Sequence, residues 1–238
     1  MLAPYTVIVG GSSGIGLATA RMLLDAGHKV TITGRAQARL DTASRELGDR
    51  PQTIVMDAAD PAAAKRALGM IGTFDHLVLS LGSTQGVGPF AEVDLAQVRQ
   101  GFEEKVFAHF ATAQAALPFL AKGGSITFVS AVTAHAAMPG TAGIGAANAA
   151  VAALVPILAA ELKPLRVNGV SPGIIDTPWW DFLAEDAKAS VFADYAAKTP
   201  VGRVGSADDI AQTIAFLVTN GFMTGGVIVC DGGIRFAG

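Results

Sequence analysis

The sequence predicts one α/β domain with a doubly wound parallel sheet of about seven strands and helices on both faces. Its 238 residues fit a single domain with a sizeable core. Short apolar runs alternate with helical patterns along the whole chain, and strict alternation is typical of a parallel sheet with right-handed crossovers. The first apolar run also leads straight into a glycine-rich turn and a helix, in the stretch VIVGGSSGIG.

Seven runs rich in β-branched and apolar residues predict strands that are covered on both faces, at 5–9, 29–33, 53–57, 76–81, 125–130, 166–170 and 227–230. The patterns between them predict helices at 14–26, 36–47, 61–70, 95–121, 143–162 and 207–219. Asp60, Asp94 and Ser206 stand where N-caps are expected, and Pro61 suits the first position of its helix. No internal repeat, linker or second domain interrupts this order, so 1–238 is expected to be a single domain.

Composition excludes several classes of function. With 51% hydrophobic and 16% charged residues the chain is globular and not disordered, and its net charge of −3 gives no basic footprint for nucleic acid. Cys230 is the single cysteine and the four histidines are scattered, so neither a disulfide framework nor a metal site is expected. The N-terminal residues have no basic region typical of a signal peptide. We therefore expect a cytoplasmic protein.

The stretch 142–160 is nearly as long as a membrane span and contains one polar residue, Asn148. However, it consists mostly of alanine and glycine, which contribute little transfer energy, and Pro156 lies inside it. A helix packed between other elements accounts for it better than a span, so no membrane partner is expected. Its small apolar side chains permit close helix approach, and we expect a homodimer or homotetramer built on this face.

The segment 174–200 is long, follows a strand and is rich in aromatic residues: Trp179, Trp180, Phe182, Phe192 and Tyr195. A segment of this kind, beyond the carboxyl end of a strand in an α/β sheet, commonly covers a ligand crevice. We expect it to cover a small, fairly apolar substrate.

The glycine-rich turn predicts a dinucleotide site. Gly10, Gly14 and Gly16 let the backbone turn sharply and approach a pyrophosphate, which the free N–H groups of the following helix attract. A residue about twenty positions later selects the dinucleotide, and here Gly34 and Arg35 end the second strand. No carboxylate is present to repel a 2′-phosphate, and a guanidinium is available to pair with it. NADP(H) is therefore the expected cofactor.

These motifs resemble those of the short-chain dehydrogenase/reductase family, from Tyr5 to Gly233. Asp57 in VMDA matches the residue that contacts adenine, LRVNGVSPGIIDTPW matches the signature after the sixth strand, and the C-terminal stretch from PVGRVG to CDGG follows the family pattern. The resemblance implies a Rossmann-type fold and an oxidoreductase. It also implies cofactor contacts from Gly10, Ser12, Ser13, Gly14, Ile15, Gly16, Gly34, Arg35, Asp57, Ala58, Leu81, Gly82, Asn148, Pro172, Gly173, Ile175 and Thr177.

The resemblance breaks down at the catalytic positions. In this family a tyrosine gives the proton and a lysine four residues later lowers its pKa, a serine orients the carbonyl, and an asparagine supports a water relay. Here Ile144 stands at the tyrosine position and Asn148 at the lysine position. Ala131, directly after Ser130, falls at the serine position, and Lys105 falls at the asparagine position. The helix that normally carries the catalytic pair therefore has no proton donor at these two positions.

Two interpretations remain open. In one, the proton donor has moved: a partly desolvated Lys105 acts as the general acid, His109 shares its helix face, Asn148 binds the nicotinamide ribose, and Ser130 polarises a carbonyl. A substrate with an activated C=C or C=N bond would need less acid assistance. In the other, the chain is a catalytically silent NADPH-binding sensor or scaffold.

Overall fold

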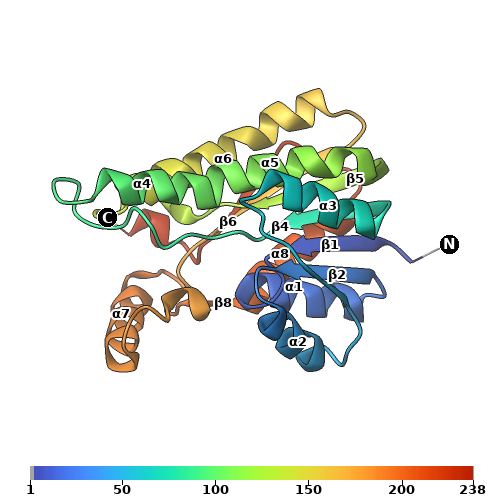
Figure 1. Cartoon of the computed structure of the whole chain (residues 1–238). Helices are drawn as coiled ribbons and strands as arrows, with labels where there is room; N and C mark the ends of the chain where they lie inside the picture. The colour runs from blue at the N-terminus through green and yellow to red at the C-terminus, as the bar shows by residue number, and fades with distance from the viewer. Residues whose placement is uncertain (1–2, 238) are drawn as a thin grey trace.

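A seven-stranded parallel sheet lies at the centre of the computed structural model, which describes residues 3–237 (Figure 1). The strand order is β3-β2-β1-β4-β5-β6-β9. The bounds are β1 Tyr5–Val9, β2 Lys29–Gly34, β3 Gln52–Val55, β4 Phe74–Leu79, β5 Leu120–Val129, β6 Arg166–Pro172 and β9 Val227–Cys230. The expected doubly wound α/β fold is confirmed.

Two layers of helices cover the sheet, and Figure 1 shows one layer above it and one below. Side chains alternate along buried strands, so Val7 and Leu77 pack into one hydrophobic cluster while Ile8 and Val78 pack into the other. The lower layer contains α1 Gly14–Asp25, α2 Gln37–Glu46 and α8 Ala207–Thr219. The upper layer contains α3 Pro61–Ile71, α4 Leu95–Phe102, α5 Ala108–Ala116 and α6 Ala142–Glu161.

The three expected N-caps are confirmed. Asp60 accepts the N–H groups of two residues in the first turn of α3, and Asp94 accepts one in α4. Ser206 forms a capping box with Asp209 at the start of α8. These side chains satisfy backbone donors that have no partner within the helix, which explains why the three helices begin where the sequence indicated.

The single helix expected over 95–121 is wrong in its middle and at its end. After α4 the chain makes a π-helical turn over Glu103–Phe107 before α5 begins. The helical run then tightens into a 3₁₀ turn, Leu117–Phe119, because Pro118 cannot donate a helical hydrogen bond, and β5 follows at once. The interruption matters because the π-turn carries Lys105.

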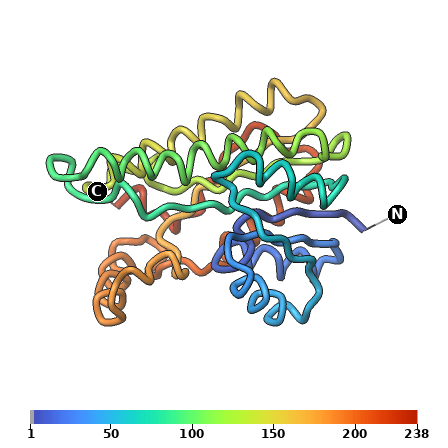
Figure 2. Tube along the Cα trace, viewed as in Figure 1, coloured from blue at the N-terminus to red at the C-terminus, as the bar shows by residue number. Residues whose placement is uncertain are grey.

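The chain reverses its direction of travel across the sheet between β1 and β4. It builds β1, β2 and β3 toward one edge and then returns to pair β4 with β1. In doubly wound sheets the crevice for a ligand lies at the carboxyl ends of the strands at such a switch point. The segment 174–200 follows the carboxyl end of β6 and projects from that side of the sheet; it is orange in Figure 2.

Segment 174–200 is more ordered than a loop. It contains β7 Ile175–Asp176, a 3₁₀ turn Pro178–Trp180 and α7 Glu185–Lys198, and β7 pairs with β8 Gly205–Ser206 to form a small second sheet. We call 174–200 the covering segment below.

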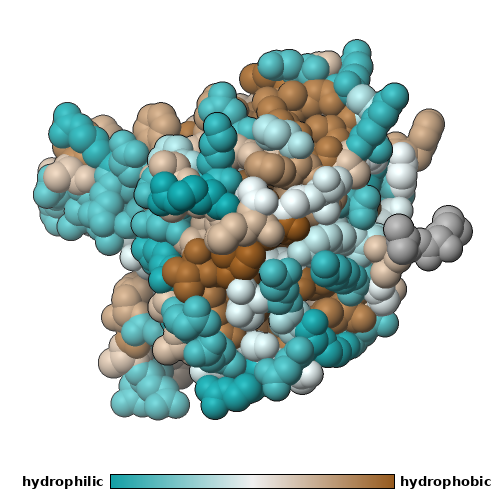
Figure 3. Space-filling view, turned by 45° about the vertical axis from the view of Figure 1, so that its right-hand side comes forward, coloured by the Kyte–Doolittle hydropathy of each residue, from teal (hydrophilic) through white to brown (hydrophobic). Residues whose placement is uncertain are grey.

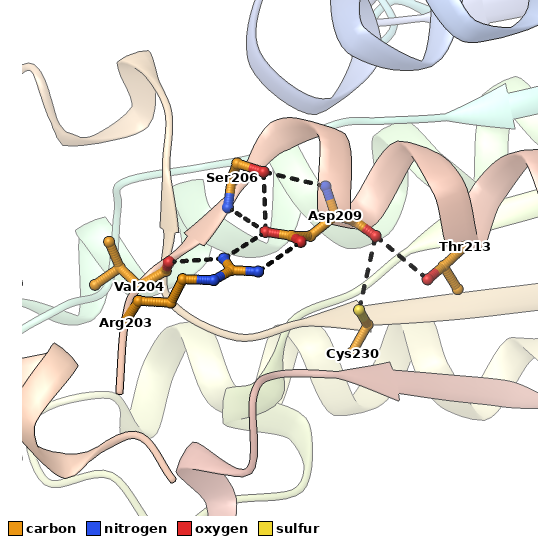
Figure 4. Close-up of polar contacts among 6 residues, drawn as sticks. All are labelled: Arg203, Val204, Ser206, Asp209, Thr213 and Cys230. Carbon is orange, nitrogen blue, oxygen red and sulfur yellow. Dashed lines mark hydrogen bonds and ion pairs between the residues drawn. The ribbon is translucent and has the colours of Figure 1, made fainter. Parts of the chain in front are cut away.

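A polar clasp follows the covering segment and secures the chain to α8 (Figure 4). The Arg203 guanidinium donates to both carboxylate oxygens of Asp209, at 2.7 and 2.8 Å. The same carboxylate accepts the Ser206 N–H at 2.7 Å. The hydrogen bond from Arg203 lowers the pKa of Asp209 most, and the bond from the Ser206 N–H adds to it. The pKa therefore lies well below its usual range.

Helix α6 is the one described helix that is long and apolar enough to cross a membrane, but it packs against β5, β6 and α4 within the domain. Only 28% of its apolar stretch is buried by the rest of the chain. Ile157 on α6 and Phe110 on α5 are 59% and 48% exposed. Figure 3 shows apolar surface over the upper helical layer, so this layer presents an unusually apolar face to its surroundings.

Candidate active site

A cavity of about 930 Å³ opens at the switch point of the sheet. Its walls come from the glycine-rich turn, the carboxyl ends of β1, β2, β4, β5 and β6, the first turns of α6 and the covering segment. Every residue expected to contact the cofactor lines this cavity except Gly16. Within residues 3–237 no group of three or more His, Cys, Asp or Glu is placed to hold a metal ion.

The glycine-rich turn brings its backbone close to the floor of the cavity, with Ser12 and Ser13 beside the glycines. Gly10 has a φ of 81°, and a Cβ there would overlap the Ser80 carbonyl group at the end of β4. A Cβ on Gly16 would overlap the Gly10 carbonyl, so Gly16 serves the close packing of α1 on the turn. Ser13, the N-cap of α1, makes no side-chain capping bond. The free N–H groups of the first turn of α1 therefore face a space that suits a pyrophosphate.

The far end of the cavity, beyond β2, is positively charged. Arg35 lines it as expected, and Arg39, four residues later in α2, lines it as well. The expectation missed Arg39, which lies in the first turn of α2, because Arg35 precedes that helix and no helical spacing joins the two residues. A Cβ on Gly34 would lie 3.1 Å from Ser12 Oγ, so glycine lets the two walls meet closely here. Asp57 and Ala58 line the adjoining wall.

Asn148 presents an unsatisfied acceptor in the cavity wall. It is 3% exposed, and its Nδ2 donates to Thr133 Oγ1 at 3.0 Å. Its Oδ1 is buried and has no hydrogen-bond partner among the described residues. A buried polar atom without a partner is costly, so this oxygen suits a ligand hydroxyl such as those of a ribose. Together with the glycine-rich turn and the two arginines, it fits a phosphorylated dinucleotide.

Ile144 lies one helical turn before Asn148 and also lines the cavity. It is 7% exposed, and its side chain has no atom that can donate or accept a proton. The first turns of α6 therefore contribute one amide and one aliphatic side chain to the cavity.

Lys105 is the buried cation of the site. The π-turn places it in the cavity wall at 4% exposure, where Nζ donates to the carbonyl of Leu81 at 2.7 Å and to that of Val129 at 2.9 Å. The Val129 carbonyl ends β5 and the Leu81 carbonyl lies in the loop just after β4, so the amino group joins the carboxyl-terminal sides of the two strands. Burial lowers the pKa of Lys105 to about 7, because the charged form loses its hydration.

His109 has an interior position and does not line the cavity. Its Nδ1 lies 2.6 Å from the Lys105 carbonyl and its Nε2 lies 3.2 Å from the Leu79 carbonyl. Burial, and then the charge of Lys105, lower the pKa of His109 to about 3, so the ring stays neutral. His109 therefore supports the backbone of the π-turn.

Ser130 lines the cavity, but its hydroxyl is already used. Its Oγ donates to the backbone carbonyl of Asn148 at 2.8 Å. The hydroxyl proton thus ties the end of β5 to α6, and its lone pairs remain as acceptors. In this arrangement Ser130 does not donate to a substrate carbonyl.

Glu104 is a site residue that the sequence did not reveal. It lines the cavity, and its Oε2 accepts the Ser83 hydroxyl at 2.7 Å. Ser83 also accepts the indole N–H of Trp179 at its backbone carbonyl, at 2.9 Å. The π-turn, the loop after β4 and the covering segment therefore meet at Ser83. These contacts join residues far apart in the chain, so no local pattern predicts them.

Aromatic rings of the covering segment form one wall of the cavity. Trp179, Trp180, Phe182 and Tyr195 all line it. Trp179 meets Trp180 edge to face at 4.8 Å between centroids, and meets Phe182 edge to face at 5.3 Å. The expectation that this segment covers an apolar part of the site fits this geometry.

Comparisons with known proteins agree with the fold and the site. The family model described as enoyl-(acyl carrier protein) reductase matches residues 9–235. A cis-4-hydroxycyclohexanecarboxylate dehydrogenase from Sinomonas cyclohexanicum is 33% identical over 239 residues, which cover 95% of this chain and 94% of that protein. A solved small-chain dehydrogenase in complex with NADPH is 30% identical with a TM-score of 0.87, over 99% of this chain and 100% of that one. A short-chain dehydrogenase/reductase from Brucella melitensis has a TM-score of 0.89 at 31% identity, over 97% and 96% of the two chains.

Proposed function

The chain belongs to the short-chain dehydrogenase/reductase family, and on that premise we propose that it is an NADP(H)-dependent oxidoreductase with a relocated proton donor. Its substrate is a small, fairly apolar carbonyl compound or alcohol, or a compound with a C=N or C=C bond. The whole chain, 1–238, acts as one domain. The observation that carries the proposal is the buried Lys105 amino group in the wall of the cavity, at the carboxyl ends of two strands.

Three parts of the cavity would each bind a different part of the dinucleotide. The glycine-rich turn and the N-terminus of α1 would take the pyrophosphate. Arg35 and Arg39 would pair with a 2′-phosphate, and Asp57 would lie at the adenine. Asn148 Oδ1 would accept a hydroxyl of the nicotinamide ribose, since it has no partner among residues 3–237. When bound, the dinucleotide supplies or accepts the hydride.

Lys105 then donates the proton that the substrate takes up after hydride addition, and accepts it in the reverse reaction. As an ammonium, Nζ has three N–H bonds, of which two are used by the Leu81 and Val129 carbonyls. The third is free to protonate the oxygen or nitrogen that gains electrons when hydride is added. With a pKa of about 7, Nζ can give up this proton and take it back near neutral pH, as a general acid and base must. In the neutral form the two carbonyl contacts remain and a lone pair takes the place of the third proton.

The other three candidates have supporting roles. His109 holds the π-turn from which Lys105 projects, and Ser130 fixes the end of β5 against α6. Asn148 binds the ribose in place of the lysine that the family usually carries. The tyrosine–lysine pair of the family is replaced by Ile144 and Asn148, and Lys105 takes over the proton transfer.

Two measurements on the purified protein test this function. NADPH binding is followed by fluorescence, and turnover is followed at 340 nm on a panel of apolar ketones, imines and enones. The proposal requires tight NADPH binding and NADPH consumption with at least one member of the panel. Binding without any turnover across the panel would instead support the second candidate, a catalytically silent NADPH-binding protein. The lack of a proton donor among the α6 residues that line the cavity, Ile144 and Asn148, favours this candidate.

We also propose that the chain forms a homodimer or homotetramer through the upper helical layer. The 28% burial of the apolar α6 stretch within one chain, with Ile157 and Phe110 exposed, supports this assembly. Light scattering at micromolar concentration should give two or four chains per particle, and a strictly monomeric particle would contradict it. An Ile157→Lys variant should shift the assembly to smaller particles. The expected compartment remains the cytoplasm.

A further inference from the structure

The charged residues of the cavity are divided unequally between its two ends. Arg35, Arg39 and Asp57 lie at the end that would hold the adenosine. The part of the cavity beneath the covering segment contains Glu104, with Lys105 beside it in sequence. Because burial lowers the pKa of Lys105 to about 7, its positive charge is partly lost near neutral pH. A carboxylate therefore dominates the charge of the substrate end.

Glu104 has hydrogen-bond donors but no cationic partner. Its Oε2 accepts the Ser83 hydroxyl at 2.7 Å, and its Oε1 accepts the Gln100 amide at 2.9 Å. None of the ion pairs formed within residues 3–237 includes Glu104. The two donors hold the carboxylate in a fixed position in the wall, and its charge is not neutralised there. A fixed carboxylate without a counter-charge attracts a cationic ligand.

A wall of packed aromatic rings lies beside the same place. The Trp179 indole N–H donates to the Ser83 carbonyl, and the Ser83 hydroxyl donates to Glu104, so the indole and the carboxylate are joined through one residue. Trp180 and Phe182 stand nearly perpendicular to Trp179, with interplanar angles of 81° and 88°. A cation in this part of the cavity would gain cation–π attraction from an aromatic face and charge attraction from the carboxylate beside the rings.

We propose that the substrate end of the cavity selects an organic cation: an iminium ion in the reductive direction and the corresponding amine in the oxidative direction. The inference rests on the proposed oxidoreductase function and specifies its substrate class. Hydride from the reduced dinucleotide adds to the iminium carbon, the C=N pair becomes the nitrogen lone pair, and the dinucleotide is oxidised. An N-alkylated iminium needs no proton in this step, which agrees with the aliphatic Ile144 in the wall. In reverse, neutral Lys105 removes the N–H proton of a protonated amine before hydride leaves.

Binding of a cation is measured first, with the NADP⁺-loaded protein. Trp179 and Trp180 are the only two tryptophans of the chain, so intrinsic fluorescence reports on this wall directly. The probe is phenyltrimethylammonium, and its neutral isostere is tert-butylbenzene. We expect the cation to bind at least about tenfold more tightly than the isostere, because it gains cation–π and carboxylate interactions. Equal affinities would overturn the inference.

Two glutamate variants test whether the charge of Glu104 causes the preference for the cation. Glu104→Gln keeps the size of the side chain and its acceptor for Ser83 but removes the charge, and it should weaken cation binding about tenfold while leaving tert-butylbenzene binding unchanged. The matched control is Glu103→Gln, which removes the neighbouring charge from a residue that does not line the cavity. The control should bind both probes like the parent protein. Unchanged cation binding in a folded Glu104→Gln protein would also overturn the inference.

Turnover separates this inference from the function on which it rests. N-methyl-3,4-dihydroisoquinolinium is compared with the neutral ketone α-tetralone, at saturating NADPH. Preferred reduction of the iminium, with the preference lost in Glu104→Gln, supports the inference. Reduction of the ketone alone overturns the inference and leaves the proposed oxidoreductase function intact. Failure to bind NADPH would remove the proposed function itself, whatever the fluorescence titration gives.

Discussion

The two ends of the cavity differ in how they are built. The cofactor end consists of one continuous stretch, the β1–α1 turn, with the end of β2 beside it, and most of its contacts come from backbone and from short sequence separations. The substrate end brings together the π-turn, the loop after β4, the start of α6 and the covering segment. Backbone geometry mainly determines the shape of the cofactor end, whereas individual side chains determine the shape of the substrate end.

This difference bears on the proposal that the substrate end departs from the family pattern while the cofactor end follows it. Gly10 and Gly16 are fixed by carbonyl groups that a Cβ would overlap, so a substitution there disrupts the fold as well as the site. Ile144, Asn148 and Lys105 are side chains on helical positions, where the backbone accepts many residue types. The chemistry at the substrate end is therefore free to change while the cofactor end persists.

The largest effect that separates the two ends is expected from Lys105→Ala. Loss of the proposed general acid should slow the hydride-transfer step of ketone reduction by about 10²–10⁴-fold, while NADPH affinity falls much less. Single-turnover kinetics and a fluorescence titration measure the two quantities. The matched control is Lys122→Ala, an exposed lysine that does not line the cavity, which should leave both unchanged. If Lys105 only anchored the ribose, affinity would fall in step with rate.

A triple substitution that introduces the family's catalytic residues tests the substrate end in the opposite direction. The triple variant Ile144→Tyr, Asn148→Lys, Lys105→Asn restores the family pattern at the substrate end. It should reduce simple ketones faster than Lys105→Ala, by at least about 10²-fold, because a positioned general acid is again present. Steady-state rates on α-tetralone provide the test. A triple variant as slow as Lys105→Ala would show that the departure extends beyond these three positions.

At the cofactor end, Arg35→Ala should weaken NADPH binding somewhat over tenfold. A charge-assisted contact with the 2′-phosphate contributes on the order of 1.5–3 kcal/mol, and NADH lacks this phosphate. Titrations with both dinucleotides measure the change, and NADH affinity should not move. Arg45→Ala, in the helix α2 that follows Arg35, is the control, since Arg45 is exposed and does not line the cavity. Equal affinities of the parent protein for NADPH and NADH would contradict this prediction.

The smallest effect is expected outside both ends, at the clasp that follows the covering segment. Arg203→Ala removes an exposed ion pair with Asp209 and should lower Tm by no more than about 2–4 °C at pH 7. The folded pKa of Asp209 is lowered, so its contribution is present above the unfolded pKa near 3.8 and is lost as pH falls below it. Thermal melts at pH 7 and pH 3 should therefore show a difference between parent and variant that shrinks in acid.

The sequence predicted the fold more completely than the site. Apolar periodicity and caps located β1, β9 and α8 at the bounds that the structure shows, because these signals are local. The sequence also located the glycine-rich turn between β1 and α1. By contrast, the π-turn leaves no pattern within 95–121 that distinguishes it from a continuous helix.

Long-range contacts explain the rest of what was missed. Glu104 bonds Ser83 across 21 residues, and Ser83 bonds Trp179 across 96. The Ser130 hydroxyl was expected to face a substrate, yet it donates to the Asn148 carbonyl on another element. Which partner a polar side chain takes depends on tertiary packing, and residue type alone does not reveal it.

The pH dependence of hydride transfer tests the relocated proton donor most directly. In the proposed mechanism ketone reduction requires protonated Lys105, whose pKa burial lowers to about 7. The single-turnover rate should therefore be constant at lower pH and fall about tenfold per pH unit above 7. Alcohol oxidation requires the neutral amine and should rise through the same pH. Lys105→Ala should lose both inflections and keep a slow, flat rate. Parent and variant profiles with the same inflection would contradict the account, because another group would then be the proton donor.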